Sequence, residues 1–198
     1  MQIDVWFEFA STYSYPAVAR INALAASQDV TVCWRPFLLG PIFKSQAWTD
    51  SPFNLYPVKG DYMWHDLERT CLNLNIPYSK PSVFPRNGLL AARVACHYST
   101  EEWVGKFILA IFAANFVHDQ DIASVDVVSA CLAELGVDAT RAIEGATSIA
   151  GKARLAEQTD QAIALGIFGA PTFAVDRELF WGNDRLEEAL EWCRTHAA

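Results

Sequence analysis

The sequence lacks the cysteine and histidine spacings that metal sites and dithiol enzymes require. It has no Cys-x-x-Cys pair and no His-x-His or His-x3-His pair among its four histidines. Its cysteines are odd in number and lie in apolar segments, where cysteine behaves as a small hydrophobic residue; they are Cys33, Cys71, Cys96, Cys131 and Cys193. The pattern argues against a zinc site and a disulfide framework, and we expect no bound metal.

Long apolar runs and clusters of positive charge are also missing. The longest strongly apolar run, 107–116, is about half the length of a membrane-spanning helix. Residues 1–4 carry neither the basic region nor the apolar core of a secretory signal, which favours a cytoplasmic protein. The net charge of −8, without any run of Lys or Arg, disfavours binding to nucleic acid or to an anionic membrane.

What is present is typical of a soluble globular protein with one sizeable core. Of the 198 residues, 52% are hydrophobic and 19% are charged. Residues 5–9 alternate as in a β-strand, a helical pattern follows over 11–27, and 30–37 is a second β-branched and aromatic strand. A strand, a helix and a strand in so short a stretch predict a parallel βαβ unit with a right-handed crossover.

Helical patterns dominate the middle of the chain. Residues 38–55 form a stretch rich in Gly, Pro, Ser and aromatics that predicts irregular structure. Start signals for later helices are the capping box Ser99-x-x-Glu102 and the single caps Ser124 and Asp138. The helices that we expect span residues 62–74, 87–98, 101–116, 125–135, 140–146 and 152–164.

Strand character returns near the C-terminus. Residues 171–175 and 179–181 predict a hairpin, and a final helix over 185–196 has Asp184-x-x-Glu187 as its start signal. The order of elements predicts an α/β protein with a thioredoxin-like fold that is split by an all-helical insertion. Residues 1–40 and 166–198 would form the thioredoxin-like domain, and residues 41–165 would form the insertion.

The junction at Ser11 is the first candidate site. A helix N-terminus directs backbone N–H groups and the positive end of the helix dipole at one spot. Ser11-x-x-Ser14 stands where thioredoxin-like proteins carry Cys-x-x-Cys, so dithiol chemistry is excluded there. No His or Lys lies near Ser11 in the sequence to activate it as a nucleophile. Its hydroxyl is suited to donate a hydrogen bond to an anion such as a thiolate.

Two further stretches allow both a structural and a functional interpretation. Pro171, after the glycines of 166–169, is either a first-strand proline or the cis-proline of a thioredoxin-like fold, which exposes the preceding backbone to an extended peptide. Residues 180–186 lead from a strand into a helix. Their N–H groups can bind a carboxylate and Asp184 can bind an ammonium, or Asn183 and Asp184 serve only as caps.

Taken together, these segments resemble a known family. The 2-hydroxychromene-2-carboxylate isomerase family, related to kappa-class glutathione transferases and more distantly to DsbA-like proteins, has similar motifs in the same order. The resemblance runs from end to end of the chain. The segments that carry it are Phe7-x-Phe9-x-Ser11-x-Tyr13-Ser14-Tyr15, Trp34-Arg35-Pro36-Phe37-Leu38-Leu39-Gly40, Gly166-x-Phe168-Gly169-Ala170-Pro171-Thr172-Phe173 and Trp181-Gly182-Asn183-Asp184-Arg185.

The resemblance implies glutathione as cofactor and a homodimer as assembly. Ser11 would face the glutathione sulfur, and Ala170 would pair with the cysteinyl backbone ahead of cis-Pro171. The residues implied to hold the γ-glutamyl end are Trp181, Gly182, Asn183 and Asp184. The residues implied to lie near an aromatic carboxylate substrate are Lys44, Asn54, Leu55 and Phe84, the last in place of a polar ring.

Three functions fit the sequence. The first is a glutathione-dependent cis-trans isomerase of aromatic degradation that converts 2-hydroxychromene-2-carboxylate, or a close analogue, to trans-o-hydroxybenzylidenepyruvate. The second is a kappa-like glutathione transferase or peroxidase, which would consume glutathione. The third is a non-catalytic thioredoxin-fold binding module, suggested by the loss of both cysteines and disfavoured by the retained Pro171 and Asn183-Asp184.

Overall fold

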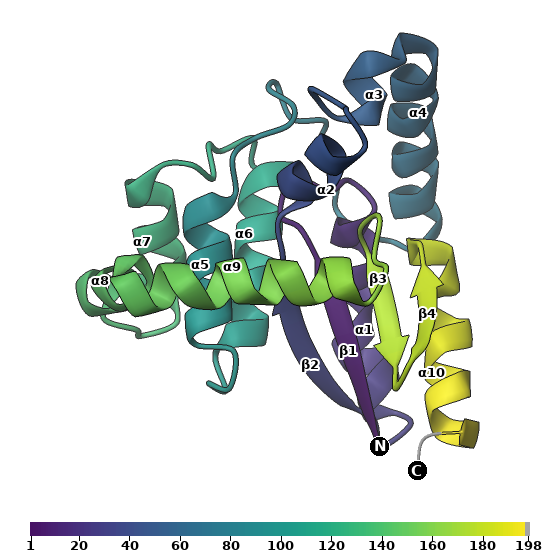
Figure 1. Ribbon diagram of the computed structural model, residues 1–198. Coiled ribbons are helices and arrows are strands. Elements are labelled where there is room, and N and C mark those ends of the chain that lie inside the picture. Colours follow the sequence, from purple (N-terminus) through teal and green to yellow (C-terminus); the bar gives the residue numbers. More distant parts are fainter. Residues whose placement is uncertain (197–198) are drawn as a thin grey trace.

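The computed structural model describes residues 1–196 and contains one four-stranded sheet, of strand order β2-β1-β3-β4 (Figure 1). Strands β1 (Gln2–Phe7) and β2 (Thr31–Pro36) are parallel and are joined by helix α1 (Ser14–Ala26). Strand β3 (Thr172–Val175) runs antiparallel to β1 and forms a hairpin with β4 (Glu178–Trp181). The predicted βαβ unit and C-terminal hairpin are therefore confirmed.

Helices fill the chain between β2 and β3, and a last turn and helix follow β4. The short 3₁₀ helix η1 (Asn183–Arg185) leads directly into α10 (Leu186–His196). None of the helices described within residues 1–196 has the length and apolar character needed to cross a membrane. The inserted helices are α2 (Leu39–Ser45), α3 (Pro52–Leu55), α4 (Pro57–Asn73), α5 (Leu89–His97), α6 (Val104–Phe116), α7 (Val125–Glu134), α8 (Ala139–Thr147) and α9 (Ile149–Ala164).

The two faces of the sheet are covered by different helices. Successive side chains of a strand point to opposite faces, so Val5 and Phe7 join the main core with residues of α1 and α10. Trp6 points the other way and belongs to a smaller cluster with Ala162 of α9. Figure 1 shows α9 crossing the sheet on one side, with α1 on the other.

The insertion and the sheet share one hydrophobic core. Phe7 and Phe9, at the end of β1, pack their rings against Phe112 of α6, with Phe9 and Phe112 centroids 5.2 Å apart. Tyr15 of α1 stacks on Phe116 at 5.5 Å. Aromatic pairs at such distances add to the free energy gained by burial. The segment that carries Ser11 is therefore held between buried aromatic rings before and after it.

The stretch predicted to be irregular contains two short helices, which is a correction. Helix α3 has Ser51 as a cap, since its hydroxyl accepts from the Phe53 N–H at 3.3 Å, and Pro52 stands in its first turn. Helix α4 follows almost at once and begins earlier than expected, at Pro57. Helices of four to seven residues complete barely one or two turns, so no hydrophobic period marks them in the sequence.

Two of the predicted start signals are confirmed and two are wrong. The side chains of Ser124 and Asp138 accept backbone N–H groups at the starts of α7 and α8. The Ser99 capping box is not formed, because residues 99–103 make turns and α6 begins only at Val104. Near Asp184, the 3₁₀ turn delays the start of α10, and Glu187 forms an ion pair with Arg20 instead of returning to the cap.

Candidate functional site

A large cavity lies where β1 ends, next to the start of α1. Its volume is about 1310 Å³, more than the roughly 300–1,000 Å³ of common small-molecule sites. Residues from both ends of the chain and from the insertion line it, and they come from the segments 8–13, 38–53, 59–70, 84–89, 168–170 and 181–185. The cavity therefore has room for a tripeptide-sized ligand together with a second small molecule.

Ser11 joins two segments that are far apart in the sequence. Its hydroxyl donates to the carbonyl of Ala170 at 2.9 Å and accepts the backbone N–H of Ser14 at 3.3 Å. Ser11 thus lies at the N-terminus of α1, where the helix dipole favours negative charge. Ser14, its partner in the Ser-x-x-Ser motif, is fully buried and is absent from the cavity lining.

Ala170 lines the cavity beside Ser11, and Pro171 follows it directly. The peptide bond between Ala170 and Pro171 is cis, as the resemblance implied. The Pro171 carbonyl accepts the Gly182 N–H at 3.0 Å, which ties this segment to the turn after β4. Gly169 lies against the indole of Trp181, since a Cβ at Gly169 would come within 2.5 Å of Trp181 Nε1. Gly169, Ala170, Trp181 and Gly182 line one side of the cavity, whereas Pro171 is buried and does not appear in the described lining.

The turn at 181–184 presents an exposed indole and an exposed carboxylate. The Trp181 ring is half exposed and packs edge-on against Phe168, with centroids 4.8 Å apart. Gly182 has φ +118°, and a Cβ there would lie 2.4 Å from Asp184 Oδ1. Only glycine fits this turn with the Asp184 carboxylate in its present position. An exposed carboxylate of this kind suits a ligand that carries an ammonium.

Arg20 of α1 fixes the buried Asn183, and the sequence had not indicated this role of Arg20. Its guanidinium donates to Asn183 Oδ1 at 3.0 Å and to the Asn183 carbonyl at 3.3 Å, and it also pairs with Glu187. Asn183 is 9% exposed. Arg20 lies in an ordinary helical pattern, and only the folded arrangement of α1 and η1 reveals its partner.

Glu8 was also missed, although it lies in the first stretch that the sequence singled out. It follows β1 directly, lines the cavity, and accepts the Ala10 N–H on Oε2 at 2.9 Å. Burial raises its pKa to about 7, against the opposing effect of the N–H groups of Ala10 and Ser11. An acidic residue at the polar position of an alternating strand predicts a solvated side chain, and the burial of Glu8 becomes visible only in the folded chain.

The predicted substrate residues divide into two groups. Phe84 lines the cavity, and its ring lies 4.9 Å from that of Trp64. Lys44, Asn54 and Leu55 are exposed and do not appear in the described lining of the cavity. The Asn54 amide donates instead to Asp50 at 3.1 Å.

Lys59, in the first turn of α4, does line the cavity. Its ammonium lies 5.6 Å from the centre of the Phe53 ring, also in the lining. A cation over an aromatic face beside an otherwise largely apolar wall is an arrangement that can receive an aromatic carboxylate. The sequence offered no signal that distinguished Lys59 from Lys44, because their positions depend on how the short helices α2 and α3 fold.

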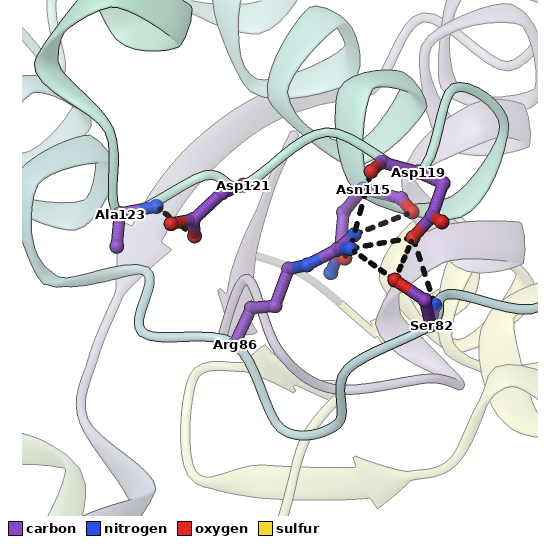
Figure 2. A network of polar contacts seen from close by, with 6 residues as sticks. All are labelled: Ser82, Arg86, Asn115, Asp119, Asp121 and Ala123. Carbon is purple, nitrogen blue, oxygen red and sulfur yellow. Dashed lines mark hydrogen bonds and ion pairs between the residues drawn. The ribbon is translucent and has the colours of Figure 1, made fainter.

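A polar network around the buried Arg86 and Asn115 supports the wall that carries Phe84 (Figure 2). Arg86 donates to Asn115 Oδ1 at 3.1 Å, to Ser82 Oγ at 3.2 Å, and to the Asp119 carbonyl at 3.1 Å, and it also forms an ion pair with the Asp119 carboxylate. The Ser82 N–H and Arg86 together hold the pKa of Asp119 below its usual value.

The same network reaches the segment of Ser11. The Asn115 amide donates to the Phe9 carbonyl at 3.4 Å, and Phe9 lies two residues before Ser11. Asp121, also drawn in Figure 2, accepts the Ala123 N–H at 3.0 Å and orders the loop beyond Asp119. The Arg86 network therefore fixes the Phe84 wall relative to the start of α1.

Within residues 1–196, His, Cys, Asp and Glu side chains form no group of three that could hold a metal ion. All five cysteines are free thiols, and four of them are buried. Burial raises the pKa of Cys71 and of Cys96 to about 11, so their thiols stay protonated near neutral pH. The candidate chemistry of the cavity therefore lies with its hydroxyl, carboxylate and cationic groups.

The fold and the cis peptide bond before Pro171 point to one class of protein. The chain belongs to the family described as DSBA-like thioredoxin domain, whose model matches residues 2–191. The predicted class, a thioredoxin-like fold that a helical insertion divides, is thereby confirmed.

Several individual proteins are similar to this chain over most of its length. A 2-hydroxychromene-2-carboxylate isomerase of Pseudomonas putida is 32% identical over 206 residues, which cover 100% of this chain and 98% of that protein. The solved structure of a selenomethionine 2-hydroxychromene-2-carboxylate isomerase has 27% identity and a TM-score of 0.88 and covers 100% of this chain and 98% of its own. Human glutathione S-transferase kappa 1 is 27% identical over an alignment that covers 93% of this chain and 87% of that protein. The resemblance inferred from the four motifs is confirmed.

Proposed function

We propose that this protein is a glutathione-dependent cis-trans isomerase that converts 2-hydroxychromene-2-carboxylate, or a close analogue, to trans-o-hydroxybenzylidenepyruvate in aromatic degradation. The observation that carries the proposal is the pairing of the Ser11 hydroxyl with the Ala170 carbonyl at the N-terminus of α1. A hydroxyl donor, a helix N-terminus and an exposed backbone segment before a cis-proline are the groups that a peptide thiolate requires.

The residues of the cavity fit glutathione. The Gly182 turn leaves space where a Cβ would meet Asp184, and the Asp184 carboxylate is free to bind an ammonium because its side chain is 79% exposed. The indole of Trp181 and the buried Asn183 complete the γ-glutamyl end of this proposed site. Ala170 would pair with the cysteinyl backbone, and the Ser11 hydroxyl would donate to the sulfur.

Bound glutathione would supply a thiolate that adds reversibly to a conjugated carbon of the substrate, so that the former double bond can rotate. The Ser11 hydroxyl and the N-terminus of α1 lower the thiol pKa from about 8.5. Lys59 and Phe84 would receive the aromatic carboxylate on the insertion side of the cavity. The Tyr13 phenol, which donates to Asp66 at 2.9 Å, stays protonated because burial and then Asp66 raise its pKa.

The second candidate is a transferase or peroxidase that uses the same thiolate, and the kappa-class relative favours it. Product analysis separates the two candidates. An isomerase leaves the total of free glutathione unchanged, whereas a transferase converts it to a conjugate and a peroxidase to a disulfide. We also propose that the protein works in the cytoplasm, where reduced glutathione is available.

The test is isomerisation of 2-hydroxychromene-2-carboxylate before and after exhaustive dialysis, with reduced glutathione then restored. We expect activity to disappear on dialysis and to return with glutathione, which is recovered unchanged. Activity that persists without any thiol would contradict the proposal. Glutathione binding by calorimetry without turnover of either substrate class would point to a non-catalytic binding module.

A further inference from the structure

Glu8 is held close to Ser11 by the turn that joins β1 to α1. Its carboxylate accepts the Ala10 N–H at 2.9 Å, and its main-chain carbonyl accepts the Ser11 N–H at 3.0 Å. The side chain is partly buried and lines the same cavity as Ser11. A carboxyl group with no role in the proposed mechanism therefore lies in the same turn and the same cavity as the proposed thiolate site.

The other charged groups of the described lining come from segments other than the turn of Ser11. The other carboxylates in this lining are Asp50, Asp66 and Asp184, and its cations are Lys59, Arg86 and Arg185. Asp66 accepts from Tyr13 and Arg69, while Arg86 and Arg185 are paired with Asp119 and with Glu188.

No charged neighbour sets the pKa of Glu8. Burial raises that pKa to about 7, and the N–H groups of Ala10 and Ser11 oppose the rise. Tyr13 and Tyr62, the titratable phenols in the lining, do not contribute to it. Near neutral pH, Glu8 can therefore both accept a proton and return it.

Ionising a thiol in this cavity changes its net charge unless the released proton stays there. A thiolate adds one negative charge next to a carboxylate, and a partly buried site disfavours two like charges. Ser11 and the start of α1 can stabilise the thiolate, but both are hydrogen-bond donors and neither can take up the proton that the thiol loses.

We propose that Glu8 receives this proton. The S–H bond of glutathione breaks, its electron pair stays on sulfur, and an O–H bond forms on the Glu8 carboxylate. One negative charge moves from carboxylate to sulfur, and the net charge of the cavity is unchanged. When glutathione leaves, the carboxyl returns the proton to sulfur. This inference rests on the proposed function, since it requires that glutathione binds in the cavity.

Proton release on binding tests the proposal. Calorimetry in buffers of different ionisation enthalpy gives the number of protons released per glutathione bound. At pH 8, wild type should release close to none, because the adjacent thiolate raises the pKa of Glu8 further in the complex and Glu8 then retains the proton. Glu8→Gln should release about three quarters of one, the fraction of thiol still protonated at that pH. Thiolate absorbance in the ultraviolet should be present in both proteins.

Matched variants and a second measurement complete the test. Glutamine keeps an oxygen acceptor for the Ala10 N–H, so the turn should be preserved, and circular dichroism checks this. Asp66→Asn removes another carboxylate of the cavity lining and should release protons as wild type does. Equal release by wild type and Glu8→Gln would overturn the role of Glu8. Failure of wild type to bind glutathione would instead overturn the proposed function.

Infrared difference spectroscopy needs no variant. When wild type binds glutathione at pH 8, a carboxylic acid band should appear while a carboxylate band is lost. Binding without this pair of changes would overturn the proposal even if Glu8→Gln failed to fold.

Discussion

Ser11 makes two hydrogen bonds with one hydroxyl, and its proposed role in stabilising a thiolate can be separated from nucleophilic catalysis. Ser11→Ala keeps the helix dipole and the backbone donors but removes one charge-assisted bond of about 1.5–3 kcal/mol. We expect turnover to fall about ten- to a hundredfold, with its pH profile shifted upward because the bound thiol becomes less acidic. Turnover as a function of pH, together with thiolate absorbance, measures both effects.

Ser14 supplies the control for that experiment. Its hydroxyl is buried and has no hydrogen-bond partner within the described residues. Ser14→Ala therefore removes the other hydroxyl of the motif while its backbone N–H still donates to Ser11. It should leave the pH profile of turnover unchanged. A complete loss of activity in Ser11→Ala with an unaltered thiolate titration would mean that Ser11 is a nucleophile.

Glu8 should make the stability of the protein dependent on pH. Its pKa is about 7 in the folded protein, against 4.5 as the ordinary value. The folded state therefore holds the proton more tightly, and stability falls as pH rises from about 4.5 to about 7. Glu8→Gln should raise the free energy of unfolding by about 1–3 kcal/mol at pH 8, with a much smaller effect at pH 4. Urea denaturation at both pH values would reject this if the two differences were equal.

At the scale of elements, the turn between β4 and α10 should act on ligand affinity and not on the fold. The Asp184 side chain is 79% exposed, and its partner Arg185 lies 3.9 Å away. Asp184→Ala should leave stability nearly unchanged and should raise the glutathione concentration needed for half-maximal activity more than it lowers saturated turnover.

Glu188→Ala is the control for Asp184. Glu188 also pairs with Arg185, at 2.9 Å, but does not belong to the described cavity lining. Its loss should leave the glutathione dependence as in wild type. A collapse of saturated turnover in Asp184→Ala, with unchanged affinity for glutathione, would contradict the assigned role.

The Arg86 network should contribute both to stability and to the position of Ser11. Arg86→Leu leaves the buried Asn115 without its donor, so we expect a loss of about 3 kcal/mol in the free energy of unfolding. Arg194→Leu breaks an exposed pair with Glu191 and should hardly change stability. Chemical denaturation compares the two variants, and similar small effects would show that the network is not needed.

Elements could be predicted where the sequence pattern that marks them lies within a few neighbouring residues. The strands of the βαβ unit, the long helices and the caps Ser124 and Asp138 carry their patterns within a few residues, and the structure has them. The network of Arg86 joins residues about thirty positions apart, and the raised pKa of Glu8 comes from burial by the folded chain. No window of sequence contains either cause.

At the scale of the whole molecule, the insertion completes the cavity that the two ends of the chain begin. Ser11, Ala170 and Asp184 come from the predicted thioredoxin-like parts, whereas Lys59 and Phe84 come from the insertion. The sequence predicted the first side because its motifs form short contiguous segments. On the second side, the resemblance implied Phe84 but not Lys59, because the fold of the short helices there sets which lysine reaches the cavity.

The assembly remains a prediction of the family resemblance. We expect a homodimer, and sedimentation velocity should give twice the mass of one chain. The expected mass should persist at high salt if apolar contacts dominate the interface. A single-chain mass at micromolar concentration would contradict the prediction.

The bond from Ser11 to Ala170 also limits which thiols can serve. The Ser11 hydroxyl can donate only one hydrogen bond, and without a ligand it donates that bond to the Ala170 carbonyl. A thiol that carries a peptide N–H can satisfy that carbonyl itself and thereby release the hydroxyl for sulfur. A simple alkyl thiol cannot, so either its sulfur or the Ala170 carbonyl would lack a donor. Small thiols should therefore enter the cavity and still be poor substitutes for a peptide thiol. The selectivity follows from the single hydrogen bond that the Ser11 hydroxyl can donate.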